Sequence, residues 1–160
     1  MTNRLRKQTI GKKHFGGTID ITDPCYDKNV WCRTTATVKD GEYSCVIWKA
    51  TESYKFEDKE HKYTLVGVIG IYLNGIIPTQ KSMKEIDSIG VDAGLAGFFK
   101  NKPDYNDDEW KEFCDSIRKG NAWIKDEGFF SSSGHGDGCY PVYAHYDANN
   151  EIDALEIRFM

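Results

Sequence analysis

Residues 63–73, YTLVGVIGIYL, decide the fold of this chain, because they are almost entirely apolar and rich in β-branched side chains. A strand with one face in water alternates apolar and polar residues, whereas a continuous apolar run is typical of a strand buried on both faces. The most apolar part, residues 65–73, is far too short to cross a bilayer as a helix. The run therefore predicts a central strand of a β-sheet, and we expect no membrane partner.

The segments before this run also read as strands. Residues 17–22, GTIDIT, alternate apolar and polar side chains and are stopped by Asp23-Pro24. Residues 34–39 and 42–49 flank Asp40-Gly41, a dipeptide suited to the positive φ values of a two-residue turn. The pattern predicts a β-hairpin that turns at Asp40-Gly41.

One segment is predicted to be helical, at about residues 107–119. Its apolar side chains recur at helical spacing and form a single stripe, Trp110, Phe113, Cys114 and Ile117. Asn106 and Glu109 have the spacing of a capping box at the helix start, and Gly120 is suited to closing its end.

The chain ends with residues 139–146 and 152–159, two alternating segments joined by the turn residues 147–150. Several short strands, turn signals between them and one helix predict a mainly β fold, either a β-sandwich or a partly open barrel built of antiparallel hairpins. The 160 residues contain no linker-like segment, so we expect residues 1–160 to form a single globular domain.

Composition narrows the classes of function. The formal net charge of −4 makes nucleic acid an unlikely partner, because nucleic-acid binding depends on neutralising phosphates. The five cysteines show no CxxC spacing, so reduced thiols are the default and no metal site is predicted. The N-terminus lacks the apolar core of a signal peptide, which predicts a cytoplasmic protein.

The stretch with the most chemistry is residues 127–140, EGFFSSSGHGDGCY, which cannot be a regular element throughout. Its glycines, Gly134, Gly136 and Gly138, indicate sharp turns or close backbone approach. Between and around them lie candidate ligand-binding side chains, namely Ser131, Ser133, His135, Asp137 and Tyr140. Hydroxyls and loop amides of this kind can converge on a polar ligand, although a long β-connection without a function has the same composition.

Two further aspartates lie in turn-like steps beside apolar sequence, Asp23 before Pro24 and Asp92 within residues 89–99, IGVDAGLAGFF. Together with Asp137 they are predicted to line one pocket. Carboxylates that meet in a pocket need a cation, a donor-rich ligand or a raised pKa. Asp23 also has a simpler interpretation, a bond from its side chain to the backbone two residues later.

Three separated segments carry a resemblance to a known family: GTIDITDPCYD, IGVDAGLAGFF, and SSSGHGDGCYPVYAHYDANNEIDALEIRF. In this order they resemble the bacterial and phage proteins of domain-of-unknown-function family 4241. The resemblance covers about half of the chain and rests on Asp23-Pro-Cys25, Val91-Asp-Ala-Gly94 and Gly136-Asp-Gly-x-Tyr140. It implies a β-rich fold and assigns no chemistry.

The hypothesis we draw from the sequence is a non-enzymatic protein that binds a small polar or nucleotide-like anionic ligand. The ligand would meet Asp23, Asp92 and the Ser131–Tyr140 loop, with Phe130 or Tyr140 covering a base. Sequestration of a host nucleotide by a phage would be compatible with this use. One alternative is a hydrolase that uses Asp92 or Asp137 with His135, and a thiol nucleophile at Cys25 or Cys139 is a weaker one. Another is a protein-interaction module with a protein partner. The sequence leaves the identity of any cofactor unknown.

Overall fold

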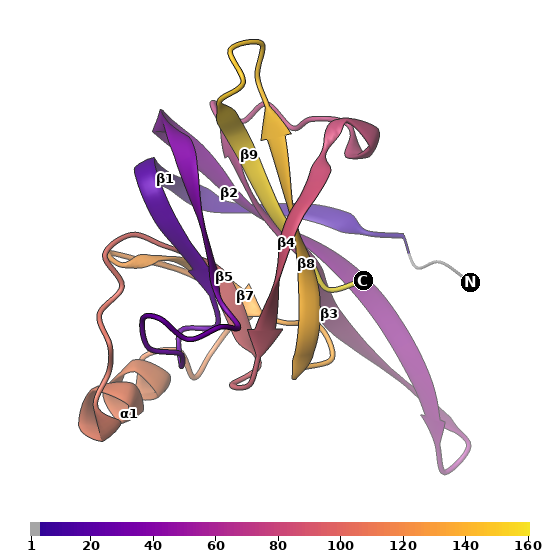
Figure 1. Ribbon diagram of the computed structural model, residues 1–160. Coiled ribbons are helices and arrows are strands. Elements are labelled where there is room, and N and C mark those ends of the chain that lie inside the picture. Colours follow the sequence, from indigo (N-terminus) through magenta and orange to yellow (C-terminus); the bar gives the residue numbers. More distant parts are fainter. Residues whose placement is uncertain (1–3) are drawn as a thin grey trace.

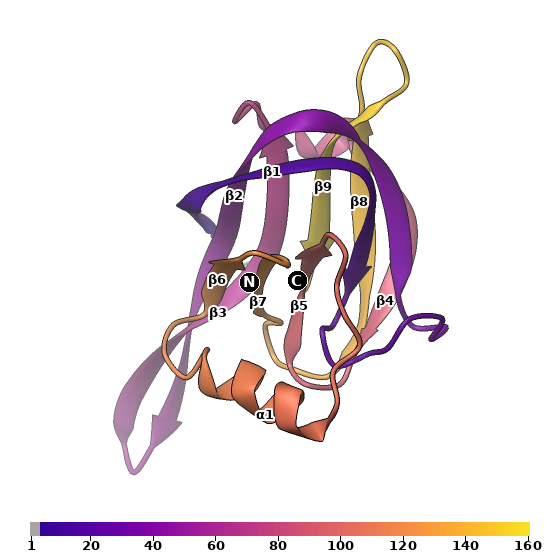
Figure 2. The same ribbon diagram turned by 90° about the vertical axis from the view of Figure 1, so that its left-hand side faces the viewer.

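The computed structural model describes residues 4–160, which form an open, strongly curled sheet of nine strands with one helix beside it (Figures 1 and 2). The strands lie in the order β4-β8-β9-β3-β2-β1-β5-β7-β6, and neighbours in this order pair antiparallel. This confirms the predicted mainly β class; the sheet curls like a barrel but stays open. The elements are β1 (Arg6–Thr22), β2 (Thr34–Phe56), β3 (Lys59–Leu73), a 3₁₀ turn η1 (Gln80–Ser82), β4 (Lys84–Val91), β5 (Leu95–Phe99), α1 (Asp107–Asp115), β6 (Ala122–Lys125), β7 (Gly128–Ser132), β8 (Gly138–Tyr146) and β9 (Ile152–Arg158).

The apolar run that begins at Tyr63 is the second half of β3, which lies between β2 and β9 near the middle of the sheet. Every residue from Val66 to Tyr72 is buried. Ile69 and Ile71 belong to the main core inside the curled sheet, whereas Tyr72 belongs to a smaller cluster with Val46 and Met83. The predicted central strand is confirmed.

The predicted hairpin at Asp40-Gly41 is wrong. Strand β2 runs through this dipeptide without reversing, and β1 follows it along nearly its whole length, from Arg6 opposite Lys49 to Ile21 opposite Thr34. Opposite Asp40-Gly41, the register of β1 shifts between Phe15 and Gly17. The dipeptide and this bulge together bend both strands, because pairing over so many residues outweighs a local turn preference.

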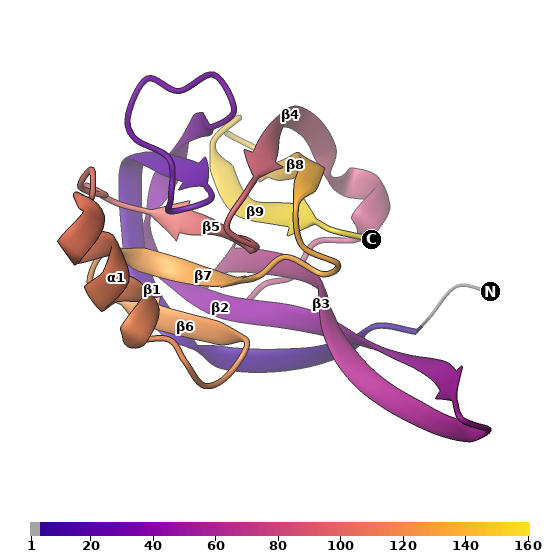
Figure 3. The ribbon, with the colours of Figure 1, turned by 90° about the horizontal axis from the view of Figure 1, so that it is seen from below.

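The reversal between β2 and β3 occurs instead at Glu57 and Asp58, which have φ values of 51° and 62°. The pairing of β1 with β2 ends at Lys49, and β9 pairs with β3 from Val68 onwards. Residues 50–66 therefore continue as a two-stranded ribbon, which we call the arm. It projects away from the rest of the sheet (Figures 1 and 3).

Helix α1 begins where the sequence predicts but is shorter. Asn106 Oδ1 accepts a bond from the Glu109 amide at 2.8 Å, and Glu109 Oε1 accepts one from the Asn106 amide at 3.1 Å, so the capping box is confirmed. The helix ends at Asp115 rather than near Lys119. Ser116 ends it by donating its hydroxyl to the Phe113 carbonyl at 2.6 Å. A side chain that bonds the backbone in this way competes with helix continuation.

The C-terminal hairpin is confirmed as β8 and β9, which pair from Val142 opposite Ile157 to Tyr146 opposite Ile152. Asp147 orders the connection, since its Oδ1 accepts bonds from the amides of Asn149 and Glu151. Within the described residues, no helix has both the length and the apolar character needed to cross a membrane.

Candidate functional site

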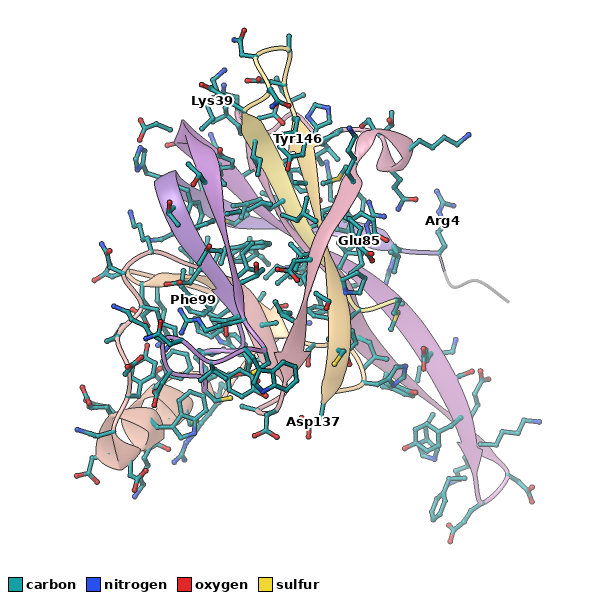
Figure 4. The ribbon with its side chains drawn as sticks, in the orientation of Figure 1. Arg4, Lys39, Glu85, Phe99, Asp137 and Tyr146 are labelled. Carbon is teal, nitrogen blue, oxygen red and sulfur yellow. The ribbon has the colours of Figure 1, made fainter. Side chains whose placement is uncertain are left out.

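The three sequence segments that contain Asp23, Asp92 and Asp137 meet at one end of the sheet, where Asp137 is labelled in Figure 4. Asp23 is fully buried. Its carboxylate accepts bonds from three backbone amides: Cys25 at 2.9 Å, Asp92 at 3.0 Å and Ala93 at 2.7 Å. The bond to Cys25 is the one expected for a turn aspartate, and the other two join this turn to the β4–β5 turn. Asp23 therefore connects two turns and has little capacity left for a ligand.

Asp92 and Asp137 are both exposed. Asp92 directly follows Val91, the last residue of β4, and Asp137 directly precedes Gly138, the first residue of β8. Because Val91 and Gly138 pair with each other, the two aspartates lie at the same end of that strand pair. The Ser133 amide bonds to the Gly94 carbonyl at 3.1 Å, which brings the loop after β7 to the β4–β5 turn. The structure thus gathers the three aspartates in one region but turns only two of them toward solvent.

The hydroxyls predicted to bind a ligand are used within the loop itself. Ser133 Oγ and Tyr140 Oη both donate to the Gly136 carbonyl, at 2.9 and 2.7 Å. Ser131 is fully buried and donates to the Ser132 carbonyl at 2.9 Å. Gly134 and Gly136 have φ values of 63° and 107°, which are the positive values that their sequence pattern predicts. These bonds hold the loop in one shape.

His135 and the two proposed stacking rings have other neighbours. His135 Nε2 lies 3.3 Å from Glu52 Oε1 on the arm, and in the described part of the chain it forms no ion pair with Asp92 or Asp137. Phe130 is fully buried against Phe99 and Trp123. The ring of Tyr140 packs edge-on against the ring of Phe159. Across residues 4–160, no group of three or more His, Cys, Asp or Glu side chains is placed to hold a metal ion.

The thiols can be tested directly, since all five cysteines are free and Cys25 is half-buried beside Asp23. Burial, followed by the Asp23 carboxylate, raises the pKa of Cys25 to about 12. At pH 8 only about one Cys25 in ten thousand is then a thiolate, the reactive form. We expect iodoacetamide to label the exposed Cys139 at least about 100-fold faster than Cys25, as read by peptide mass spectrometry. Equal rates would show that Cys25 is accessible and that burial does not suppress its thiolate.

A second region, on the outer face of the sheet, contains a partly open cavity of about 230 Å³. Strands β2, β3 and β9 supply Trp48, Val68 and Glu156, and the chain before β1 and the β3–β4 connection close over them. We call this cavity the Trp48 pocket. Its lining is mainly apolar, and it consists of Leu5, Trp48, Val68, Ile77, Pro78, Gln80 and Glu156.

A chain of hydrogen bonds forms the polar part of the Trp48 pocket. Trp48 Nε1 donates to Tyr72 Oη at 3.1 Å, and Tyr72 Oη donates to Glu156 Oε2 at 2.6 Å. Arg158 Nε donates to the other oxygen, Glu156 Oε1, at 2.9 Å. The Arg158 guanidinium carbon lies 3.7 Å from the centre of the Tyr143 ring. Burial, followed by the charge of Glu156, raises the pKa of Tyr72 well above its ordinary value. The phenol is therefore neutral and remains a donor.

Gly70 makes this arrangement sterically possible. A Cβ at position 70 would lie 2.6 Å from Cζ of Tyr72, so the phenol ring lies directly over the glycine. Glu156 is only 5% exposed, and its carboxylate is compensated by the neighbouring guanidinium. One buried polar atom, Arg158 Nη2, has no hydrogen-bond partner among the described residues. A largely buried ion pair is therefore present at the Trp48 pocket, with Glu156 in the lining and Arg158 behind it.

Sequence reasoning did not identify the Trp48 pocket. The alternation in residues 155–159 correctly puts Glu156 and Arg158 on the face of β9 opposite Leu155 and Ile157. It could not show that the 74–83 connection and Tyr72 cover this face, because that depends on contacts between distant segments. The signal that was present is the pair Gly70 and Tyr72, a glycine two residues before a large ring on a buried strand.

Comparison with known proteins adds no relative: no family model matches the chain, and no similar curated protein or solved structure is found.

Proposed function

We propose that the protein binds a small organic molecule in the Trp48 pocket, without catalysing a reaction on it. The observation that supports this proposal is the partly open, mainly apolar cavity with one buried, hydrogen-bonded carboxylate in its wall. Binding sites for small molecules are typically concave and apolar, with a few fixed polar groups that orient the ligand. The volume of about 230 Å³ suits a ligand with a single ring or a short aliphatic chain.

The polar lining determines the chemistry of the ligand. Among the described residues that line the pocket, Glu156 alone is charged, and an ionised carboxylate can only accept hydrogen bonds. Its two oxygens accept one bond each from Tyr72 and Arg158, so further lone pairs remain. We therefore infer a ligand with an apolar body and one terminal donor group, and a primary ammonium group fits best because it only donates and because Glu156, not Arg158, lines the cavity. The indole of Trp48 adds an aromatic face that attracts cations.

This ligand class differs from the nucleotide-like anion that the sequence suggests. An anion in the pocket would meet the Glu156 carboxylate, whereas Arg158, which offsets the charge of Glu156, does not line the cavity. The loop at residues 131–140 offers an anion fewer donors than its composition suggests, because Ser131, Ser133 and Tyr140 already donate to carbonyls.

The proposal predicts a preference between two matched probes, phenethylamine and 3-phenylpropionate, which share a ring and a two-carbon chain. We expect isothermal titration calorimetry to show that phenethylamine binds at least about tenfold more tightly, a difference of about 1.4 kcal/mol. Glu156→Gln should abolish the preference, because the amide lacks the negative charge. If neither probe binds, or if the preference survives in Glu156→Gln, the proposal is wrong.

Two neighbouring isoleucines provide a control for the position of the site. Ile77 lines the Trp48 pocket, whereas Ile76 is 73% exposed and does not line it. Ile77→Ala should weaken phenethylamine binding by about tenfold through lost apolar contact, and Ile76→Ala should leave it unchanged. Circular dichroism of each variant checks that the sheet remains folded.

A further inference from the structure

Residues 51–65 of the arm, none of which is buried, have an unusual surface for a segment outside the core. Cross-strand partners lie on the same face of a ribbon, so one face contains Tyr54 opposite His61 and Glu52 opposite Tyr63. The rings of Tyr54 and His61 stack at a centroid distance of 5.2 Å, and Tyr63 Oη donates to Glu52 Oε2 at 2.7 Å. Phe56, on the same face, is 60% exposed. This face is aromatic yet largely uncovered by the described residues.

The two edges of the arm are also open in the described chain. Beyond the pairings that end at Lys49 and begin at Val68, the backbone of residues 50–56 and 59–65 faces no third strand. A two-stranded ribbon by itself is marginally stable in water, and an open edge is a template for pairing with another strand. The arm is therefore shaped for strand addition, and its charges show which strand fits.

A second copy of the chain can pair with the β3 edge in a self-complementary way. In an antiparallel pair of identical strands with His61 opposite His61, Glu60 lies opposite Lys62 of the second copy, and Lys62 lies opposite its Glu60. Opposite charges in directly opposed positions stabilise a strand pair, and like charges destabilise it. Centring the pair on Glu60 or on Lys62 instead puts two like charges opposite each other. The charges thus select the register centred on His61.

The rest of this register is also favourable. Lys59 lies opposite Tyr63 of the second copy, a pairing in which the ammonium group can contact the ring. Within one chain, Glu60 is already opposite Lys55 of β2, so the row Lys55, Glu60 and Lys62 of the second copy alternates in sign. The β2 edge offers no equivalent, because the register centred on Tyr54 pairs Ser53 with Lys55 and Glu52 with Phe56.

The shape of the molecule permits this contact. The arm ends at Glu57 and Asp58, and it points away from the body of the sheet (Figures 1 and 3). Because the two β3 strands would run in opposite directions and overlap near their tips, the two bodies would lie at opposite ends of the joined arms. We propose that the chain self-associates through residues 59–63 of the arm, forming a four-stranded ribbon with a two-fold axis at His61.

Two charge reversals test the proposal together. Glu60→Lys gives a chain with lysine at both positions, and Lys62→Glu gives a chain with glutamate at both, so each variant repels its own copies. In an equimolar mixture, every 60–62 pair is again attractive. We expect sedimentation velocity to show concentration-dependent dimers of twice 18.2 kDa for the wild type, at least about tenfold weaker association for each variant alone, and restored dimers in the mixture.

Glu57→Lys is the matched control, since it changes the net charge as Glu60→Lys does. Residue 57 lies in the turn before β3, outside the paired residues 59–63, so this variant should associate like the wild type. The mixture also separates loss of the contact from loss of folding, because a misfolded variant could not restore association in its partner. A monomeric wild type at millimolar concentration, or a mixture no more associated than its components, would overturn the proposal.

Discussion

Asp23→Ala is expected to destabilise the protein by about 4 kcal/mol, a large share of the stability of an ordinary domain. The substitution removes a buried carboxylate that accepts bonds from the amides of Cys25, Asp92 and Ala93. Each of these part-buried donors left without a partner costs up to about 1–3 kcal/mol, and the two turns that Asp23 joins would no longer be held together. Urea unfolding followed by circular dichroism measures the loss.

Two further substitutions make this result specific. Asp23→Asn keeps the size of the side chain but presents an NH2 group to one set of backbone donors, so it should also destabilise, by about 2 kcal/mol. Asp92→Ala removes an exposed carboxylate from the same turn and should change stability by less than about 0.5 kcal/mol. If Asp23→Ala and Asp23→Asn lost no more stability than Asp92→Ala, the structural role of the Asp23 carboxylate would be refuted.

Gly97→Ala is expected to cost about 3 kcal/mol or more, because the strand pair leaves no room for a side chain at this position. Gly97 lies opposite Phe130 in the pairing of β5 with β7. A Cβ there would lie 2.5 Å from Cα of Phe130 and would also overlap the Phe129 carbonyl. These are backbone atoms of a buried strand, so they cannot move without separating β5 from β7.

The matched control is Gly11→Ala in β1. A Cβ at this position would meet only the terminal methyl carbon of Ile124, at 2.8 Å, and a flexible side chain can rotate away. We expect a change of less than about 1 kcal/mol for Gly11→Ala, measured by the same thermal unfolding that is used for Gly97→Ala. Similar losses in both variants would indicate that crowding of the backbone at Gly97 is not the cause.

The sequence predicts most accurately those features that depend on neighbouring residues. The capping box at Asn106 and Glu109, the C-terminal hairpin, and the positive φ values at Gly134 and Gly136 are all present. Each arises from bonds or steric limits within a few residues, so distant parts of the chain need not be known. The length of helix α1 was less predictable, because the Ser116 hydroxyl competes locally with continuation of the helix.

The hairpin at Asp40-Gly41 shows where local reasoning fails. Asp-Gly favours a tight turn, but the same two residues can also occupy a bend in a continuous strand. The choice depends on β1, whose long pairing with β2 is a contact between segments far apart in the sequence. The real reversal, at Glu57-Asp58, lies in a polar stretch that carries no glycine or proline.

For the candidate sites, too, local sequence patterns and tertiary contacts determine different features. Residue type and spacing were enough to predict that the chain is mainly β, since the periodicity of a strand does not depend on distant contacts. Tertiary structure alone decided that Asp23 is buried under three amides and that the loop hydroxyls bond to their own backbone. It also decided that Trp48, Tyr72 and Glu156 meet beside a cavity. The physical reason is that burial and hydrogen-bond partners are set by pairing between distant strands, which a linear pattern does not encode.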